Sequence, residues 1–506
     1  MQNNNKRLAK NSLIMYVQVF LGMVIGFVSA RVLLKTLGAA DYGTYNVVAG
    51  FVGTMAVISG PMVSGIQRFF AYDMGKNNRE QLSCDFNTTN IIYVIFGVII
   101  IILLETVGLW FLNNHMSFEN GRMDVVHWVY QLSIFSFFFS VIATPYNALI
   151  LAHENIFVNT IFDIINRVGN LVIVLSLSLI PYDHLITYST LACILAVIMR
   201  LLPRIYCKKK YPESKFRLYW DKRYFKSIVS YSAFNTIGVL AGVGRSQGVN
   251  VLLNMFYGPV VNAARAVSSQ LQGIVSALYM NIFTPARPQI TKYYAREEFN
   301  QMWTLVERAT KVMFFVCMVI SVPLCLESEY VLRLWLGDYP DLAPTFLRLS
   351  LIVSLLSSSS ILNCAVLQAA NKIKREQIFV ASITLMTLPL AYIAMKLGAG
   401  PISPFIIAAV LQFFSIIVDI QVVQYELKEK MGFYYLLLLK LYGTCILSLV
   451  LPLILMSQMP SSFLRVVVVT LVSIISCSLL SWIICLNKDD RRMAVDMMKR
   501  MLHRNK

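Results

Sequence analysis

The sequence predicts an all-α integral membrane protein with about fourteen transmembrane helices, built as two six-helix lobes and a C-terminal helix pair. The 506 residues are 57% hydrophobic and only 14% charged, whereas soluble domains carry about 25% charged residues. The apolar residues come in blocks of roughly 18–25, each long enough to cross a bilayer core of ~30 Å. A repeated segment, described below, indicates the two lobes.

Fourteen apolar blocks follow one another along the chain. The first follows a basic start, is too long for the core of a signal peptide and lacks a small-residue cleavage site, so we expect it to remain as a membrane span. Pro and Gly inside several blocks are tolerated in membrane helices. The expected spans are 12–34, 43–66, 88–112, 126–150, 156–180, 185–206, 228–254, 259–283, 304–326, 344–369, 377–397, 403–425, 433–456 and 464–486.

Basic residues alternate between the connections of these spans. The even-numbered connections and both chain ends are rich in Lys and Arg, above all the stretch 207–226, while the odd-numbered connections hold few. Because cytoplasmic loops retain Lys and Arg, both termini are predicted to face the cytoplasm of a bacterial inner membrane. Lys and Arg in the cytoplasmic loops then account for most of the net charge of +18. The sequence offers no soluble basic face that could bind nucleic acid.

An internal repeat supports the division into lobes. VLLKTLGAADYGTYNV at 32–47 resembles VLLNMFYGPVVNAARAV at 251–267, an offset of six spans. An even offset preserves orientation, so we expect parallel repeats with a substrate cavity between the halves. The predicted parts are an N-lobe (1–206), a basic cytoplasmic loop (207–226), a C-lobe (227–425), an additional helix pair (426–486) and an amphipathic tail on the inner leaflet (487–506).

The residue pattern offers no enzyme chemistry. The nine cysteines mostly lie in apolar runs without CxxC or Cys/His ligand spacing, and only five histidines are scattered along the chain. No phosphate-binding Walker motif is present. We therefore expect a protein that is not an enzyme and has no metal site or cofactor.

The most informative charges lie at the start of the second half. No acidic residue occurs between Asp221 and Glu297, yet Arg245 lies deep in the Gly-rich stretch GVLAGVGRSQGVN and Arg265 follows in the next span. Ionisable groups at this depth usually face a cavity or a partner. A carboxylate from the first lobe is one possible partner. The sharper hypothesis is that Arg245, Arg265 and Arg31 form a cationic patch that binds a phosphate. Guanidinium groups bind phosphate bidentately.

Other polar residues inside the spans are secondary candidates. An arginine near a span end can reach the interface instead, and Asp163 can pair with Arg167 at i, i+4. A lone buried carboxyl is either a protonated structural group or a site for a coupling ion. The secondary candidates are Arg68, Arg167 and Arg200 for the phosphate, Asn250, Asn254 and Gln270 for sugar, and Glu105 and Asp419 for coupling.

Four segments resemble a known family. They are LLKTLGAADYGTYNV (33–47), YNALILAHENIFVNTIFDIINRVGNL (146–171), QGVNVLLNMFYGPVVNAARAVSSQLQGIVSAL (247–278) and RPQITKYYAREE (287–298). They are similar to bacterial polysaccharide-biosynthesis membrane proteins, the O-antigen or capsule repeat-unit flippases of the multidrug/oligosaccharidyl-lipid/polysaccharide exporter superfamily. The resemblance covers essentially the whole chain and implies the fold of the multidrug and toxin extrusion (MATE) transporters.

The resemblance implies that the chain moves an undecaprenyl-pyrophosphate-linked oligosaccharide across the inner membrane by alternating access. In related lipid II flippases, arginines on the first helix and around helices seven and eight are thought to hold the pyrophosphate; Arg31, Arg245 and Arg265 match them by helix and depth. The expected partners are the lipid-linked oligosaccharide and membrane lipids, with a polysaccharide polymerase and chain-length proteins as further candidates. We expect a monomer driven by protons, Na⁺ or the membrane potential.

Two alternatives remain open. Cation-coupled multidrug exporters of the same superfamily use a carboxylate on the first helix or on helices seven, eight and ten, but this chain has no acidic residue in 1–40. A membrane O-antigen polymerase or ligase needs acid/base residues and a large periplasmic loop, and the external turns here are short. The lack of acidic residues in 1–40 and the short external turns both favour the flippase hypothesis.

Overall fold

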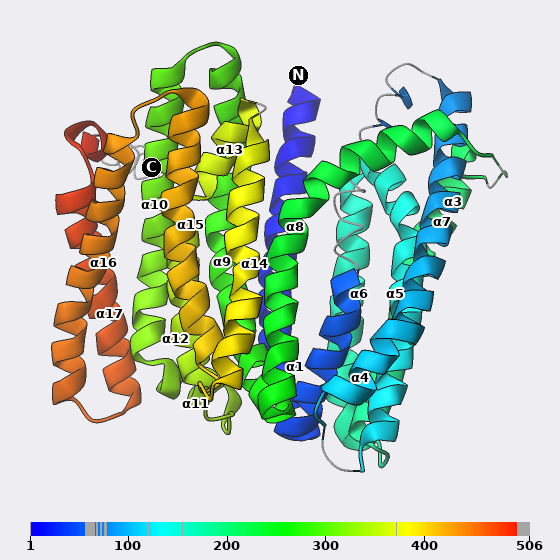
Figure 1. Ribbon diagram of the computed structural model, residues 1–506, viewed down its shortest axis with the longest axis horizontal. Helices are drawn as coiled ribbons and strands as arrows, with labels where there is room; N and C mark the ends of the chain where they lie inside the picture. Colours follow the sequence, from blue (N-terminus) through cyan, green and yellow to red (C-terminus); the bar gives the residue numbers. More distant parts are fainter. Residues whose placement is uncertain are drawn as a thin grey trace. The chain divides into compact units, whose positions relative to one another are not determined.

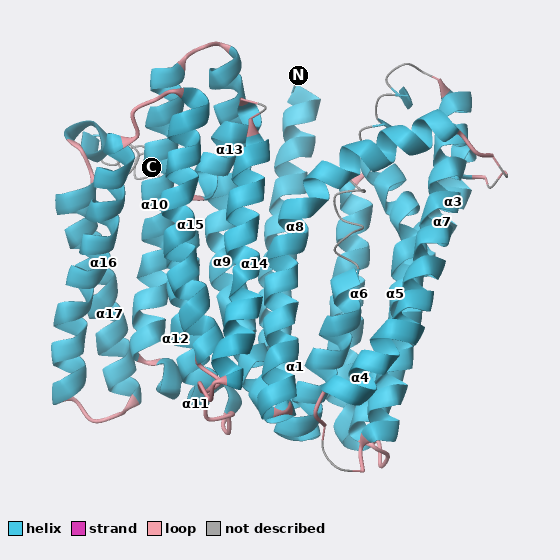
Figure 2. Cartoon of the chain, viewed as in Figure 1, coloured by secondary structure: helices cyan, strands magenta, loops and turns pink. Residues whose placement is uncertain are grey.

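The computed structural model describes residues 2–55, 66, 69–70, 73–74, 78–118, 121–153, 155–215, 217, 219–370 and 372–492. Within these residues the chain forms helices joined by short loops and turns, and no strand (Figures 1 and 2). Ten of the described helices are long and apolar enough to cross a membrane. The all-α membrane fold is confirmed, while the count of fourteen spans stays a prediction.

Contacts between residues divide the chain into two compact units, Met1–Ala266 (unit 1) and Val267–Lys506 (unit 2). The boundary falls inside a helix, beyond the basic loop at which the sequence divides the lobes. The predicted domain limits stay predictions. The helices of unit 1 are α1 (Gln2–Gly53), α3 (Arg79–Leu103) with a π turn (Leu104–Gly108) and α4 (Leu109–His115), α5 (Met123–Ala152), α6 (Ile156–Ser176), α7 (His184–Lys210), α8 (Lys222–Tyr257) and the start of α9 (Pro259–Ala295).

A kink in α1 lies where the sequence predicts the first external turn. Gly38 has φ 75° and ψ 171°, so the helix breaks between its two halves. This backbone conformation suits glycine because it has no Cβ. Beyond the kink, Gly43 brings α1 against the start of α9: a Cβ added at Gly43 would lie 1.8 Å from the carbonyl oxygen of Pro259. Gly43 therefore allows two backbones of unit 1 to touch.

Replacing Gly43 by alanine is expected to destabilise the protein by roughly 1–3 kcal/mol, the usual cost of overpacking. The obstructing atom belongs to backbone, so no side chain can turn aside to make room. The apparent melting temperature of the purified protein measures the effect. Gly443→Ala in α16 is the matched control, because no atom of the described residues lies within 4 Å of its added Cβ; equal melting of the two variants would contradict this packing.

The chain between α7 and α8 is fixed to the beginning of α3. The Asn87 side chain donates to the carbonyl oxygen of Lys215 at 3.3 Å and accepts from the backbone N–H of Arg217 at 2.7 Å. Thr88 donates to the carbonyl oxygen of Tyr219 and accepts from the backbone N–H of Asp221. Asn87 and Thr88 are buried, so this part of the basic loop is anchored to unit 1.

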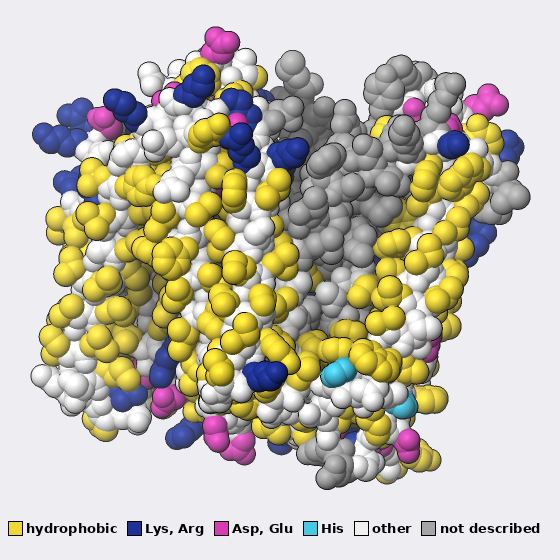
Figure 3. Space-filling model, in the orientation of Figure 1, with side chains coloured by type: hydrophobic (Ala, Val, Ile, Leu, Met, Phe, Trp, Pro, Cys, Tyr) yellow, Lys and Arg dark blue, Asp and Glu magenta, His cyan; other side chains and the backbone are white. Residues whose placement is uncertain are grey.

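Unit 2 is a helical bundle built from the rest of α9 and the helices that follow. α14 and α15 lie side by side, as do α16 and α17 (Figure 1). On the face of unit 2 drawn in Figure 3, apolar side chains cover the middle of the helices and Lys and Arg lie near their ends, as expected for membrane-spanning helices. The helices are α10 (Phe299–Leu326), α11 (Ser328–Leu336), α12 (Ala343–Ser358), α13 (Ile361–Ala369), α14 (Ile373–Lys396), α15 (Ser403–Leu427), α16 (Gly432–Gln458), α17 (Phe463–Leu480) and a closing π turn (Ser481–Cys485).

Candidate functional site

Polar side chains form a stripe along α6, a helix otherwise apolar enough to cross the membrane. Asp163, Asn166, Arg167 and Asn170 follow one another at i, i+3, i+4 and i+7, so they share one face of the helix. All four line a cavity of about 340 Å³ whose opposite wall comes from α1. Because polar groups at membrane depth face water or a partner, this stripe marks a polar lumen inside unit 1.

The α1 wall of this cavity is built from small residues. A Cβ added at Gly22 would lie 2.6 Å from Nη1 of Arg167, so glycine leaves the space that the guanidinium fills. Gly26 and Ser29 continue the wall along α1. The guanidinium of Arg167 is thereby held against a helix face that carries no carboxylate.

A second cavity of about 330 Å³ shares Asn166 and Asn170 with the first. Its α5 wall carries three serines at i, i+3 and i+7, and its α7 wall carries another serine and an arginine. Hydroxyl and amide groups both donate and accept hydrogen bonds, so this lining matches the hydroxyl groups of a sugar. The serines are Ser133, Ser136, Ser140 and Ser189, and the arginine is Arg200.

Arg200 lines more than one cavity of unit 1. It also lines a smaller cavity of about 120 Å³, together with Asn90 and Arg204. Its charge interacts with that of Asp163 on α6. With Arg167 and Arg200 against Asp163, the charged groups lining the two larger cavities carry a net positive charge. The lumen of unit 1 therefore favours a ligand that is polar and anionic.

Arg245 and Arg265 form a second cationic cluster in unit 1. Nη2 of Arg265, on α9, donates to the carbonyl oxygen of Ser246 at 2.7 Å and lies 3.3 Å from its hydroxyl. The positive charge of Arg245 acts on Arg265. Two like charges on adjacent helices repel, and an anion bound between them would relieve this repulsion. The structure thus brings together the two arginines on which the sequence hypothesis depends most.

The remaining predicted ligands are more dispersed. Arg31 is exposed on α1, and Arg68 lies outside the described residues. Asn250 accepts from Asn262 at 2.7 Å. The fully buried Asn254 accepts from the backbone N–H of Ser117 at 2.9 Å. Both asparagines thus make packing contacts within unit 1, and their role toward sugar stays a prediction.

Gln270 lies on α9 in unit 2, partly buried. Of the two coupling candidates, Glu105 lies in the π turn of unit 1 and accepts from Gln131 at 3.0 Å. Asp419 is buried on α15 of unit 2, and its Oδ2 accepts from Nδ2 of Asn363 at 3.0 Å.

The Asp419–Asn363 pair leaves acceptor oxygens unused. Oδ1 of Asp419 and Oδ1 of Asn363 are both buried and make no hydrogen bond within the described residues. Buried polar atoms are normally satisfied, so these two oxygens can accept from a donor or a cation. A carboxylate and an amide oxygen are ligands that a hard cation prefers. This pair is thus suited to hold a proton or a small cation.

The serines of α5 and the asparagines of α6 were not among the residues predicted for the site. Their signal was present: Ser133, Ser136 and Ser140 repeat at helical spacing inside a predicted span, and Asn166 and Asn170 flank Arg167 on one face. Serine is common on membrane helix interfaces, so only the cavity in the structure gives these residues a shared surface.

Comparison with known proteins places this geometry in context. A family model described as "Polysaccharide biosynthesis protein" matches residues 8–294. A comparison with curated proteins gives no significant match. The solved structure of the lipid II flippase MurJ in an inward closed conformation is 13% identical, has a TM-score of 0.70 and is matched over 94% of this chain and 98% of that chain.

Other solved structures share the same fold. An inward-facing multidrug resistance MATE family transporter of the MOP superfamily is 14% identical, with a TM-score of 0.65 over 81% of this chain and 96% of that chain. A MOP superfamily transporter from Pyrococcus furiosus, described as having reverse polarity of its binding pocket, is 14% identical, with a TM-score of 0.58 over 83% and 97%. The expected MATE-like fold is confirmed.

Proposed function

Because this chain belongs to the polysaccharide biosynthesis protein family, we propose that it is a flippase for undecaprenyl-pyrophosphate-linked oligosaccharide, such as O-antigen or capsule repeat units. It would act in a bacterial inner membrane with both termini in the cytoplasm, by alternating access and without chemical change to its cargo. Its partners would be the lipid-linked oligosaccharide, membrane lipids and, downstream, a polymerase with its chain-length protein.

The observation that carries this proposal is the polar lumen of unit 1. Two cavities that share Asn166 and Asn170 offer together a serine-lined wall for sugar hydroxyls and arginines for negative charge. An exporter of cationic drugs would need a net acidic lumen instead, because a buried positive charge repels such cargo. The lining therefore favours the flippase over the multidrug exporter.

In this proposal the pyrophosphate is held by arginine. Arg245 and Arg265 form the main pair, and Arg167 and Arg200 guide the anionic end of the cargo through the lumen, with Arg31 and Arg68 as further candidates. Guanidinium groups stay charged when partly desolvated and bind phosphate through two parallel hydrogen bonds. Asn250, Asn254 and Gln270 would assist at the sugar when the lobes move.

Coupling would use Asp419 of unit 2, with Asn363 beside it. Their two unused oxygens would take up a proton or Na⁺ in one state of the transport cycle and release it in another. Glu105 is the second candidate, and the membrane potential acting on the charged cargo is a third source of energy.

Ser136→Leu tests the sugar cavity. The larger side chain should fill space meant for sugar and lower delivery of surface polysaccharide about tenfold, as expected for steric exclusion from a pocket. The measurement is surface polysaccharide in cells that lack the chromosomal gene and carry the variant. Phe135→Leu, one residue away and 51% exposed, is the matched control and should behave as wild type.

If cells with Ser136→Leu make the protein at a normal level and still show wild-type surface polysaccharide, the serine-lined cavity does not bind the sugar. Susceptibility to cationic dyes separates the rival function: a drug exporter would lower susceptibility when it is expressed, whereas a flippase would leave it unchanged. A polymerase or ligase would instead leave translocation intact and change only chain length or attachment.

A further inference from the structure

The last helix of unit 2 is joined to α10 by buried ion pairs at both of its ends. In the first turn of α17, Arg465 meets Glu327, at the end of α10, at 2.8 Å. After its closing π turn, Asp490 meets Lys311 at 2.9 Å on the opposite half of α10. Glu327 is 1% and Lys311 5% exposed. Since breaking a buried pair is strongly unfavourable, these contacts hold α17 beside α10.

Beside the Lys311–Asp490 ion pair lies a cavity of about 500 Å³, bounded by α10, α16 and α17. Its walls are almost entirely apolar, with Phe314, Phe315 and Met318 on α10, Leu441 on α16 and Trp482 beyond α17. A water occupies ~30 Å³ and a methylene group is of similar size, so the cavity has room for a long hydrocarbon chain. Water has few polar partners there, and an apolar occupant is expected.

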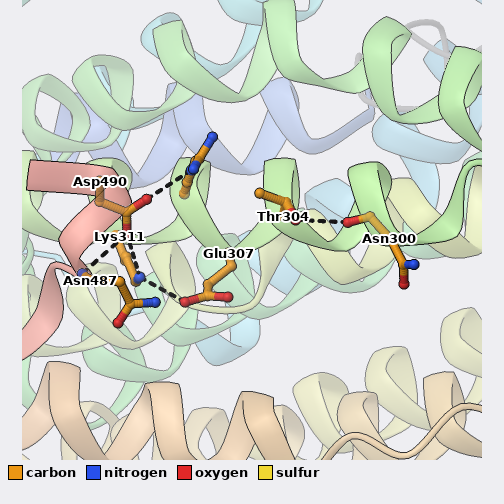
Figure 4. Close-up of polar contacts among 7 residues, drawn as sticks. Asn300, Thr304, Glu307, Lys311, Asn487 and Asp490 are labelled. Atoms are coloured by element: carbon orange, nitrogen blue, oxygen red, sulfur yellow. Dashed lines mark hydrogen bonds and ion pairs between the residues drawn. The ribbon is translucent and has the colours of Figure 1, made fainter. Parts of the chain in front are cut away.

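Arg308, Lys311 and Asp490 are the charged residues of the cavity lining, and Figure 4 shows the contacts that join Lys311 to Asp490 and Glu307. Lys311 is neutralised within this cluster, because its Nζ contacts both Glu307 at 2.7 Å and Asp490 at 2.9 Å. Arg308 differs: only its Nε binds Asp490, at 2.8 Å, and its side chain is 35% exposed. Within the described part of the chain, neither terminal nitrogen of this guanidinium makes a hydrogen bond or ion pair, so both can bind an anion at the mouth of the cavity.

The cavity also reaches the surface of the protein. Val312, one turn from Arg308 on α10, lines the cavity and is 48% exposed. From Arg308 to Met318 the helix rises roughly 15 Å, which gives an apolar slot with its cations, Arg308 and Lys311, in the first turn. A headgroup anion joined to a hydrocarbon chain complements this arrangement in both shape and charge.

From these features we propose that unit 2 binds a membrane glycerophospholipid between α10, α16 and α17. The phosphate contacts Arg308, and one acyl chain fills the cavity. The lipid is a resident component that packs the C-terminal helix pair against α10, and it is distinct from the transported cargo, whose polar site lies in unit 1. Asp490 positions Arg308 through its Nε and so turns the free edge of the guanidinium toward the phosphate.

The test is retention of phospholipid by the full-length protein, purified in detergent from cells that make no lipid-linked oligosaccharide and measured by native mass spectrometry. Wild type should retain phospholipid through washing. Ser478→Trp, which fills the cavity from α17, and Arg308→Gln, which removes the phosphate contact, should each lower retention about tenfold. Leu447→Trp, on the exposed face of α16, is the matched control and should retain the lipid.

Equal retention by wild type, Ser478→Trp and Arg308→Gln would overturn the proposal. So would retention that appears only when the lipid-linked oligosaccharide is present, because the site would then belong to the cargo. If Ser478→Trp does not give monodisperse protein, Ser478→Leu takes its place with the same expected loss. The proposed flippase function is unaffected by these outcomes, since its variants lie in unit 1.

Discussion

Replacing both Arg245 and Arg265 by alanine is expected to abolish surface polysaccharide while the protein still inserts at normal level. The two guanidinium groups lie together on α8 and α9 of unit 1, where their charges act on each other. A hydrogen bond to a charged group is worth ~1.5–3 kcal/mol, so losing two such partners should weaken pyrophosphate binding by about a hundredfold or more. The measurement is surface polysaccharide together with lipid-linked oligosaccharide retained inside the cell.

The lysine variants Arg245→Lys and Arg265→Lys provide the internal control. They keep the charge but lose the planar pair of donors, so they should restore transport only in part. Arg296→Ala, an exposed cation beyond the end of α9, should have no effect. Normal export by the double alanine variant would show that the phosphate is held elsewhere.

Asp419→Asn is expected to stop transport driven by an ion gradient. The change preserves shape and leaves the hydrogen-bonding side chain, but it removes the negative charge from a carboxyl that is 6% exposed. A site that must alternately bind and release a cation cannot work with a neutral amide, so the rate should fall about a hundredfold, as for the loss of a buried charge partner. The measurement is lipid-linked oligosaccharide translocation in proteoliposomes under an imposed proton or Na⁺ gradient.

Ser415→Ala, one turn earlier on α15 and likewise buried, is the matched control and should transport as wild type. If Asp419→Asn responds to the gradient as wild type does, the carboxyl is structural. In that case Glu105→Gln and the membrane potential become the next variables to test in the same vesicles.

The membrane fold could be predicted because hydropathy depends only on local sequence. The break in α1 at Gly38 falls in the connection predicted between 12–34 and 43–66. The closeness of Arg245 and Arg265 also followed from the chain, since short connections keep consecutive membrane helices adjacent. These features need no knowledge of how distant segments meet.

Partners from distant helices could not be predicted in this way. The i, i+4 spacing suggested that Asp163 pairs with Arg167, but the structure places Arg167 against Gly22 of α1 and the charge of Asp163 near Arg200 of α7. Arg465 lies near the start of a predicted span, where an arginine can reach the interface, yet it pairs with Glu327 from 138 residues away. Both relations depend on helix packing, which single-sequence periodicity does not specify.

The central claim, that unit 1 recognises a phosphate-bearing lipid through its arginines, is tested most directly by equilibrium binding. Purified protein in lipid nanodiscs would be titrated with undecaprenyl pyrophosphate and, separately, with undecaprenol. We expect saturable binding of the pyrophosphate, lost in the variant with Arg245 and Arg265 replaced by alanine, and at least ~100-fold weaker binding of undecaprenol. Equal affinity for the two lipids, or unchanged pyrophosphate binding in the variant, would contradict the account.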